Sequence, residues 1–231
     1  MLNQQEYIKK FSNIQEIIVA VTSELIAWIE PGMNEKYIAE RYGMILASNG
    51  LSKHWYPILV YAGKNTGKPI SRRFHLPTSE DIIKKTDIVF VDCTPIDGTV
   101  WGNWSDTIII GSNKFYESLV ADTKEIVKDT MIYAKTKAKT VGDVYDYCIN
   151  LVNIKGMTSL DLRNDIGHSI FQVPIDSTVE DTPMGDRIFI SKEYQNKELS
   201  GILSIEPQLG RINPEDGLMY GAKTQEVIVY S

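Results

Sequence analysis

The stretch DIVFVDCTPIDGTVWGNWSDTIIIG, residues 87–111, places two runs of apolar and β-branched residues on either side of Asp97-Gly98. An Asp-Gly pair between such runs is a strong hairpin signal, because its tight turn needs residues that accept a positive φ. We therefore expect residues 87–96 and 104–111 to pair as antiparallel strands.

Helical patterns lie on both sides of this hairpin. Apolar side chains recur at helical spacing near the start of the chain until Pro31-Gly32, and Asn34 is a suitable N-cap for the next helix. The helical segments that we expect are 4–30, 35–48, 114–137 and 141–152.

The remaining segments indicate strands joined by turns and one long loop. Residues 62–82 are rich in Gly and Pro and predict an ordered loop, of the kind that often carries function. The order of two helices, strands, two helices and strands predicts an α+β domain of two αα-plus-sheet halves, spanning 1–231 as one domain. The further strands that we expect are 58–61, 167–173, 186–191, 201–207 and 225–230.

Composition narrows the class of partner. A net charge of −6 gives no positive field for nucleic acid, and the polar N-terminus lacks the apolar core of a signal peptide. No apolar run approaches the length of a membrane span. The two cysteines, Cys93 and Cys148, are too few and too far apart for a disulfide framework or a thiolate metal site. We expect a cytoplasmic protein that binds neither nucleic acid nor membrane.

Several polar residues stand on the predicted strands. The chain has three histidines, His54, His75 and His168, and residue type alone does not mark any of them as a site residue. His168 becomes a candidate because it follows a glycine at the start of a predicted strand. The residues that could converge with it on one sheet face are Asp92, Asn103, Glu206 and Gln225. The plain alternative is a set of strand ends beside turns, where acids are common.

The order of short motifs is more specific than any one of them. The pieces PG after a long helix, IVFVD, DT followed by G, GHSI, SIEP and GAKTQEVIV resemble, in that order, the pita-bread peptidases. That family includes methionine aminopeptidase, aminopeptidase P, prolidase and creatinase. The resemblance covers nearly the whole chain and implies a catalytic domain with the pita-bread fold, two αα-plus-antiparallel-sheet halves around a central cleft.

The resemblance also implies a site with defined positions. Peptidase members hold two divalent metals with Asp, Asp, His, Glu and Glu, and a metal-bound water attacks the amide. Asp92 matches the first Asp, His168 the His and Glu206 the first Glu. The second Asp position, counted from Asp92 without a gap to Gly111, falls on Asn103 rather than on Asp106.

The last ligand position is changed in the same way. Four residues after Gly221 the family pattern has a Glu, and this chain has Gln225, followed by Glu226. Sliding the register by one would make Glu226 the ligand, but it would turn the other strand face inward. We therefore favour Gln225.

These two positions carry the metal-bridging carboxylates of the family. Amides are neutral and offer weaker oxygen ligands. The two remaining carboxylates could therefore balance the charge of one divalent ion, but not comfortably that of two. At two further positions where peptidase members carry a histidine, this chain has Ile175 and Ile70. His75 or His54 could take the place of the histidine missing at position 70.

Other residues near these motifs could form a substrate pocket. Trp55, Tyr56 and Trp101 are aromatic wall candidates, with packing in the core as the equal alternative. Arg72 and Arg73 could clamp a substrate carboxylate or simply be solvated.

The sequence thus favours an enzyme that has left metal-dependent peptidase chemistry and needs no cofactor. His168 and Glu206 would do acid/base work on a C–N bond, with Asp92 orienting or binding a cationic group. Asn103, Gln225 and His75, with the aromatic residues, would bind a small amino-acid-derived molecule.

Two alternatives stay open. One is a metallo-aminopeptidase or X-Pro peptidase, acting on short peptides with one Mn, Fe, Co or Zn ion held by the five aligned residues. The other is a non-catalytic binding protein. The long first helix packs either internally or across a homodimer.

Overall fold

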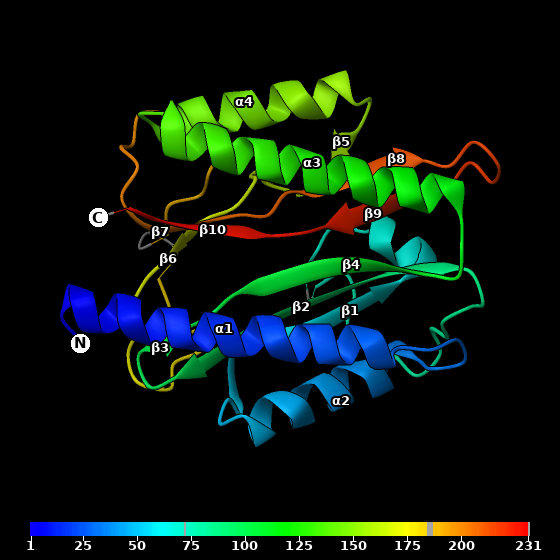
Figure 1. Cartoon of the computed structure of the whole chain (residues 1–231), viewed down its shortest axis with the longest axis horizontal. Helices are drawn as coiled ribbons and strands as arrows, with labels where there is room; N and C mark the ends of the chain where they lie inside the picture. The colour runs from blue at the N-terminus through cyan, green and yellow to red at the C-terminus, as the bar shows by residue number, and fades with distance from the viewer. Residues whose placement is uncertain (72, 184–186, 231) are drawn as a thin grey trace.

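The computed structural model describes residues 1–71, 73–183 and 187–230, and its strands lie between two pairs of helices (Figure 1). The expected order of helices and strands, and the expected two halves, are confirmed. The elements are α1 Gln4–Trp28, α2 Glu35–Ser48, β1 Lys53–Ala62, η1 Gly63–Gly67, β2 Asp87–Asp97, β3 Val100–Trp101, β4 Trp104–Ile110, α3 Lys114–Thr136, α4 Val141–Ile154, β5 Thr158–Ser159, β6 Ser169–Ile170, η3 Lys192–Tyr194, β7 Gly201–Ile205, β8 Gln208–Ile212, β9 Met219–Lys223 and β10 Glu226–Tyr230.

The first half is built on the predicted hairpin. β2 pairs antiparallel with β4 over seven residue pairs, from Asp87 opposite Ile110 to Cys93 opposite Trp104, and with β1 on its other side. Gly98 has a φ of 64°, as the tight turn requires. β1 is longer than the strand predicted at 58–61, because two irregularities in its pairing hide the alternation of its side chains.

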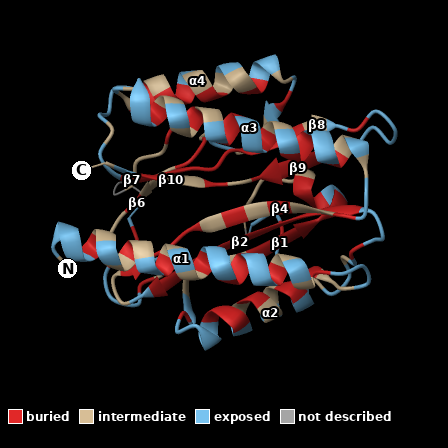
Figure 2. Ribbon diagram, viewed as in Figure 1, coloured by how far each residue is buried: buried red, intermediate tan, exposed pale blue. Residues whose placement is uncertain are grey.

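The helices of this half cover the outer face of the hairpin sheet. α1 begins with a capping box between Asn3 and Glu6, and Asn34 caps α2 as expected. The apolar face of α1, which includes Ile18 and Leu25, is fully buried against the sheet, while its opposite face is exposed (Figure 2).

The second half contains two three-stranded antiparallel sheets under α3 and α4, in the orders β10-β7-β6 and β5-β8-β9. The strand predicted at 186–191 is wrong. Asp186 lies outside the described residues. Residues 187–191 form one isolated bridge, between Phe189 and His168. Main-chain hydrogen bonds join Ile188 and Ile190 to residues 166–169, and the Ile188 N–H donates to the Ser169 hydroxyl, but the pairing does not extend into a regular strand.

Two other strand predictions need correction. The strand predicted at 167–173 is limited to β6, and the segment at 225–230 starts one residue later, at Glu226. The preceding residues form a separate strand, β9, which pairs with β8. Thr224 and Gln225 lie between these two strands, and the side chain of Gln225 is buried.

Close contacts join the two halves. The main chain of Lys223 exchanges hydrogen bonds of 2.8 and 2.6 Å with the Thr107 hydroxyl, which ties β9 to β4. A Cβ on Gly221 would lie 2.3 Å from the Thr66 carbonyl oxygen, so only glycine allows η1 to approach β9 this closely. The C-terminal strands are thereby held against the hairpin.

The structure also bears on the membrane question. Among the described residues, no helix combines the length and apolar character needed to cross a bilayer.

Candidate functional site

Residues distant in sequence meet where the two halves face each other. Asp92 comes from β2, Asn103 lies just before β4, His168 precedes β6, Glu206 follows β7 and Gln225 lies between β9 and β10. The hydrogen bonds and ion pairs described below join them into one cluster, which we call the central site. All except His168 are buried.

Lys223 stands in the middle of the central site, and the sequence analysis did not single it out. Its ammonium Nζ lies 2.5 Å from Oδ2 of Asp92 and 2.6 Å from Oε2 of Glu206. Lys223 is two residues before Gln225, a spacing that puts both side chains on one face of an extended chain. That spacing was the available signal in the sequence.

Glu206 is surrounded by donors. Its Oε1 accepts hydrogen bonds from Asn103 Nδ2 at 2.7 Å and Ser204 Oγ at 2.5 Å, and it lies 3.2 Å from His168 Nε2. Burial is the largest influence on its pKa and raises it, but Lys223, His168 and Ser204 together outweigh burial and lower the pKa to about 2. Glu206 is therefore a charged, fully engaged carboxylate.

His168 is fixed by its own main chain and by Glu206. Gly167 has a φ of 146°, and a Cβ there would lie 2.0 Å from the Ser204 carbonyl oxygen, so glycine lets the histidine segment approach β7. Nδ1 lies 3.1 Å from the Ser169 carbonyl oxygen and Nε2 faces Glu206. Each ring nitrogen of His168 therefore faces an oxygen atom.

The two amides lie together. Gln225 Nε2 donates to the Asn103 main-chain oxygen at 2.8 Å, and Gln15 on α1 donates to the same oxygen at 2.5 Å. Gln225 Oε1 is buried without a hydrogen-bond partner among the described residues. Its neighbour Glu226 pairs with Ile205 in the sheet.

Asp106 lies away from the central site. Its carboxylate pairs with Lys124 on α3 at 3.2 Å and accepts a bond from the Thr107 main chain. The structure therefore brings Asn103, rather than Asp106, next to Glu206.

The charges of the central site are coupled. Burial raises the pKa of Asp92, and repulsion from Glu206 raises it further, against the opposing effect of Lys223. Burial lowers the pKa of Lys223, but attraction to Asp92 and Glu206 outweighs burial and raises it, so the ammonium stays protonated.

These contacts do not fit the pair of divalent metals that the resemblance implies. The Lys223 ammonium already lies between the two remaining acids, and a metal there would meet both its charge and its volume. The oxygens of Glu206 are taken by N–H and O–H donors, and the two other positions are neutral amides.

The aromatic candidates lie beside His168. Trp101 is fully buried with its ring centroid 5.8 Å from that of His168, and Trp55 stacks on Trp101 at 4.2 Å. The indole N–H of Trp55 donates to Thr182 Oγ1. Tyr56 is half-buried on β1, and its main-chain N–H donates to Thr94 Oγ1.

His75 belongs to a second polar cluster. Its Nε2 lies 2.5 Å from Oε2 of the fully buried Glu35 and 4.0 Å from Oδ2 of Asp81. The three ligand atoms lie within 4.8 Å of one another, as a metal site needs. In this structure Glu35 Oε1 accepts two further N–H groups, from Ala62 and Asn65, so the cluster braces α2 against the segment after β1.

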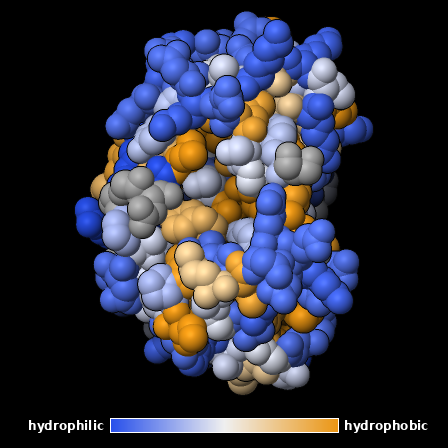
Figure 3. Space-filling view, turned by 90° about the vertical axis from the view of Figure 1, so that its left-hand side faces the viewer, coloured by the Kyte–Doolittle hydropathy of each residue, from blue (hydrophilic) through white to orange (hydrophobic). Residues whose placement is uncertain are grey.

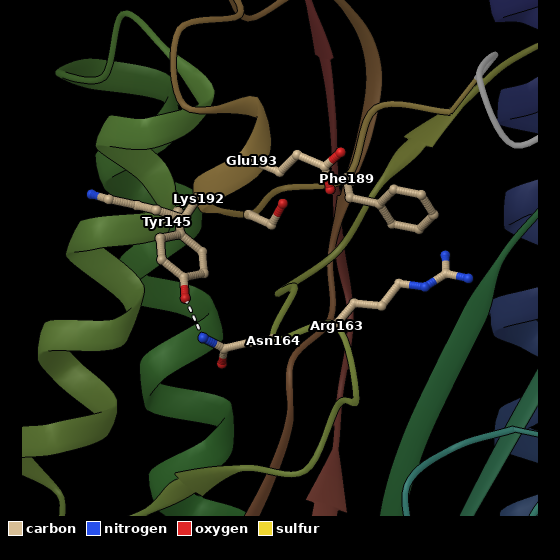
Figure 4. A pocket seen from close by; sticks show the side chains of 7 residues that line it. Tyr145, Arg163, Asn164, Phe189, Lys192 and Glu193 are labelled. Carbon is tan, nitrogen blue, oxygen red and sulfur yellow. Dashed lines mark hydrogen bonds between the residues drawn. The ribbon is translucent and has the colours of Figure 1, made fainter.

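A cavity of about 360 Å³ opens beside the central site, between α4, the turn at Arg163 and Asn164, and the segment containing Phe189. Asn164 Nδ2 donates to the Tyr145 hydroxyl across it (Figure 4). The Phe189 ring, which forms one wall, also stands 6.4 Å from the His168 ring.

The fold places the chain among the pita-bread proteins. Residues 9–229 match Metallopeptidase family M24, and the chain belongs to this family. A comparison with curated protein sequences gives no match.

Solved structures with the same fold are remote in sequence. X-Pro aminopeptidase from Thermotoga maritima superposes with a TM-score of 0.76 at 17% identity, over 99% of this chain and 59% of that one. Prolidase from Pyrococcus furiosus gives 0.73 at 20% identity, over 98% and 61%. Methionine aminopeptidase from Thermotoga maritima gives 0.72 at 18% identity, over 100% and 95%. The chain thus spans about three fifths of the first two proteins and nearly all of the third.

Proposed function

We propose that this M24 family member is an enzyme that acts without a metal, on a C–N bond of a small amino-acid-derived substrate. The observation that supports it is the Lys223 ammonium between Asp92 and Glu206. Two carboxylates need a cation when they are buried, and a side chain of the protein supplies it here. The protein then needs no metal to balance its central site.

The central site offers the two functions that such chemistry needs. A lysine ammonium has three hydrogens, and two of them face Asp92 and Glu206, which leaves one for the oxygen of a substrate. Fixed donors of this kind stabilise negative charge that develops in a transition state. His168, held between Ser169 and Glu206, donates a proton to the leaving nitrogen. In a hydrolysis, the proton of the attacking water would pass to Asp92, whose pKa is raised.

The amides and aromatic rings bind the substrate in this proposal. Gln225 Oε1 is a buried acceptor without a partner among the described residues, so it is suited to a substrate N–H group. Asn103 holds Glu206, and Trp101 with Trp55 forms an apolar wall. Tyr56 and His75 would contribute from β1 and from the Glu35 cluster. We place the protein in the cytoplasm, in keeping with its free, buried cysteines.

Metal analysis of the purified protein, combined with turnover assays, tests the proposal. We expect less than one bound transition-metal ion per chain, and turnover of an amide, guanidino or X-Pro substrate that a chelator leaves unchanged. Glu206→Gln should lower kcat by at least about 100-fold, because it removes the partner of His168. Two tightly bound ions, or activity that appears only with added Mn²⁺ or Co²⁺, would refute the proposal.

A matched variant validates the metal assay. Lys223→Met combined with Asn103→Asp and Gln225→Glu removes the internal cation and restores both family acids, so it should gain binding of Mn²⁺ or Co²⁺. The alternative, a peptidase that uses one Mn, Fe, Co or Zn ion, instead predicts metal in the unmodified protein. Substrate binding without turnover, unaltered in Glu206→Gln, would indicate a non-catalytic binding protein.

A further inference from the structure

One buried hydroxyl beside the central site has no hydrogen-bond partner. Ser105 on β4 is fully buried, and its Oγ finds neither a donor nor an acceptor among the described residues. A hydroxyl that gives up its contacts with water on folding costs free energy unless another polar group replaces them. Ser105 therefore offers an unused hydrogen-bonding group inside the protein.

The alternation of β4 directs Ser105 towards the interior. Successive side chains of a strand point to opposite faces of the sheet. Asn103, just before the strand, and Ser105 and Thr107 within it are buried, whereas Trp104 and Asp106 between them are partly exposed. The three buried polar residues thus share one face of the strand.

The neighbours of Ser105 on this face both reach the second half of the molecule. Asn103 Nδ2 donates to Glu206 at 2.7 Å, and Thr107 Oγ1 donates to the main-chain oxygen of Lys223 at 2.6 Å. Ser105 lies between these two contacts along the strand. Its hydroxyl therefore faces the central site and is the one group of the three that binds nothing there.

Asp92 lies directly across the sheet from Ser105. The two residues are partners in the antiparallel pairing of β2 with β4, and the Cβ atoms of such partners stand about 5 Å apart on one face. Lys223 binds Oδ2 of Asp92 at 2.5 Å, and no hydrogen bond to Oδ1 occurs among the described residues. The Ser105 hydroxyl and the second oxygen of Asp92 are thus neighbouring polar groups that do not bind each other.

This pair of groups has the chemistry to hold a water molecule. A water between them donates one hydrogen to Ser105 Oγ and the other to Asp92 Oδ1, which leaves its lone pairs free to attack a carbon atom. Two polar partners are the fewest with which a buried water is usually held. The carboxylate that binds the water is also a base that can take its proton.

The surface near the central site gives little help in placing a water. β6, which follows His168, lies between the two halves on the side of the termini (Figure 1). From that side, hydrophobic side chains gather between two largely hydrophilic ends of the molecule (Figure 3). A water that reacts at the central site therefore needs a polar partner from the interior, and Ser105 is such a partner.

We propose that Ser105 is a positioning residue that holds the attacking water of a hydrolysis against Asp92. This inference rests on the proposed function, because it assigns the reaction class at the same site. The water oxygen forms a bond to the carbon of the C–N bond while one of its protons passes to Asp92. The electron pair of the C–N bond leaves with the nitrogen, which takes a proton from His168. Exchange of one proton through solvent then returns Asp92 and His168 to their starting states.

A crystal structure of the purified protein that resolves ordered water tests this inference directly. We expect a water within about 2.7–3.2 Å of both Ser105 Oγ and Asp92 Oδ1. Ser105→Ala should lose this water, and Ser105→Thr, which keeps the hydroxyl, should retain it. Arg73→Gln is a surface control that should leave the water in place, because Arg73 is an exposed arginine of the loop that the sequence suggested as a clamp. Its neighbour Arg72 lies outside the described residues.

Kinetics separates positioning from folding. With the amide, guanidino or X-Pro substrate that the protein hydrolyses, Ser105→Ala should lower kcat about 100-fold and change KM less than about twofold, because the water is misplaced while the substrate contacts remain. Ser105→Thr should recover most of the rate. Ser177→Ala is the matched control and should leave kcat unchanged. The Ser177 hydroxyl is also buried without a partner among the described residues, but it lies on the segment between β6 and η3.

Three results would overturn the inference. They are the absence of an ordered water between Ser105 and Asp92, a water that stays in Ser105→Ala with kcat unchanged, and a loss of kcat in Ser177→Ala as large as that in Ser105→Ala. The crystallographic readout needs neither turnover nor a known substrate. The absence of this water from an active, metal-independent enzyme would therefore refute this inference alone. A water held by Ser105 in a protein that needs added metal for activity would refute the proposed function and leave the role of Ser105 in place.

Discussion

Glu206 and Glu35 are both buried glutamates beside a histidine, yet their pKa values shift in opposite directions. Burial raises the pKa of Glu35, and its bonds to Asn65 and His75 do not compensate. The pKa of Glu206 falls to about 2, although burial acts on it in the same sense. The difference lies in Lys223, a permanent cation 2.6 Å from Glu206 that has no counterpart among the groups influencing Glu35.

This comparison separates two uses of a buried acid. Glu35 is held by N–H donors and a histidine and braces the fold, so its charge is not essential. Glu206 is kept charged by a cation from another strand, which makes the central site a preformed ion pair. Buried ion pairs seldom add stability over apolar packing, so their retention suggests a functional role.

Removing the Lys223 cation should have the largest effect on the stability of the protein. Lys223→Met leaves Asp92 and Glu206 buried and uncompensated, and we expect a loss of about 3–5 kcal/mol in the free energy of unfolding at neutral pH. Urea unfolding measures it. The control is Lys124→Met, which removes a partly exposed pair with Asp106 and should cost at most about 1 kcal/mol. Equal losses in the two variants would show that Lys223 does not balance the central site.

The pH dependence of stability sharpens the comparison. The pKa of Glu206 is lowered from 4.5 to about 2, so its contribution is present above pH 4.5 and is lost as pH falls towards 2. That shift corresponds to about 3 kcal/mol. Glu206→Gln should therefore flatten the acid limb of the stability curve, measured by urea unfolding between about pH 2.5 and 7.

Glu35 should behave with the opposite sign. Its pKa is raised above 4.5, so its contribution is complete below pH 4.5 and is lost as pH rises through the higher folded-state value. Glu35→Gln removes this loss, and its stability relative to the unmodified protein should improve as pH rises. The same slope in both glutamine variants would contradict the assignment of Lys223 as the deciding group.

Much of this architecture could be predicted from the sequence, because local signals specify it. The Asp97-Gly98 turn, the caps at Asn34 and the periodicity of α1 depend on neighbours in the chain. The meeting of Asp92, Asn103 and the other aligned residues followed from motif order, which carries information about the whole fold.

The rest depends on contacts between distant segments. A lysine near a predicted strand end is usually solvated, and only the pairing of β9 with the Thr107 hydroxyl brings Lys223 inside. Residues 188–190 have strand composition, but they form only an isolated bridge with the segment at His168, and the Ile188 N–H donates to the Ser169 side chain.

The smallest expected loss of stability among the central-site variants is that of Asn103→Asp. Asn103 Nδ2 donates to Glu206 at 2.7 Å, so Asn103→Asp replaces a donor by an acid next to a charged carboxylate. We expect a loss of about 2 kcal/mol at neutral pH, measured by urea unfolding, which should shrink as pH falls and one acid of the pair is protonated.

Asp106→Asn is the matched reverse change, and the pair decides which residue of GNWSD belongs to the central site. Among the described residues Asp106 pairs with the half-exposed Lys124 on α3 and with the main chain of Thr107, so its loss should change stability by less than about 0.5 kcal/mol and leave kcat unchanged. The single charge of Lys223 faces two acids, Asp92 and Glu206. The acid introduced by Asn103→Asp would be a third one, without a cation of its own. If Asp106→Asn were the more damaging variant, the acid would have to face inward, and the strand register that places Asn103 beside Glu206 would be wrong.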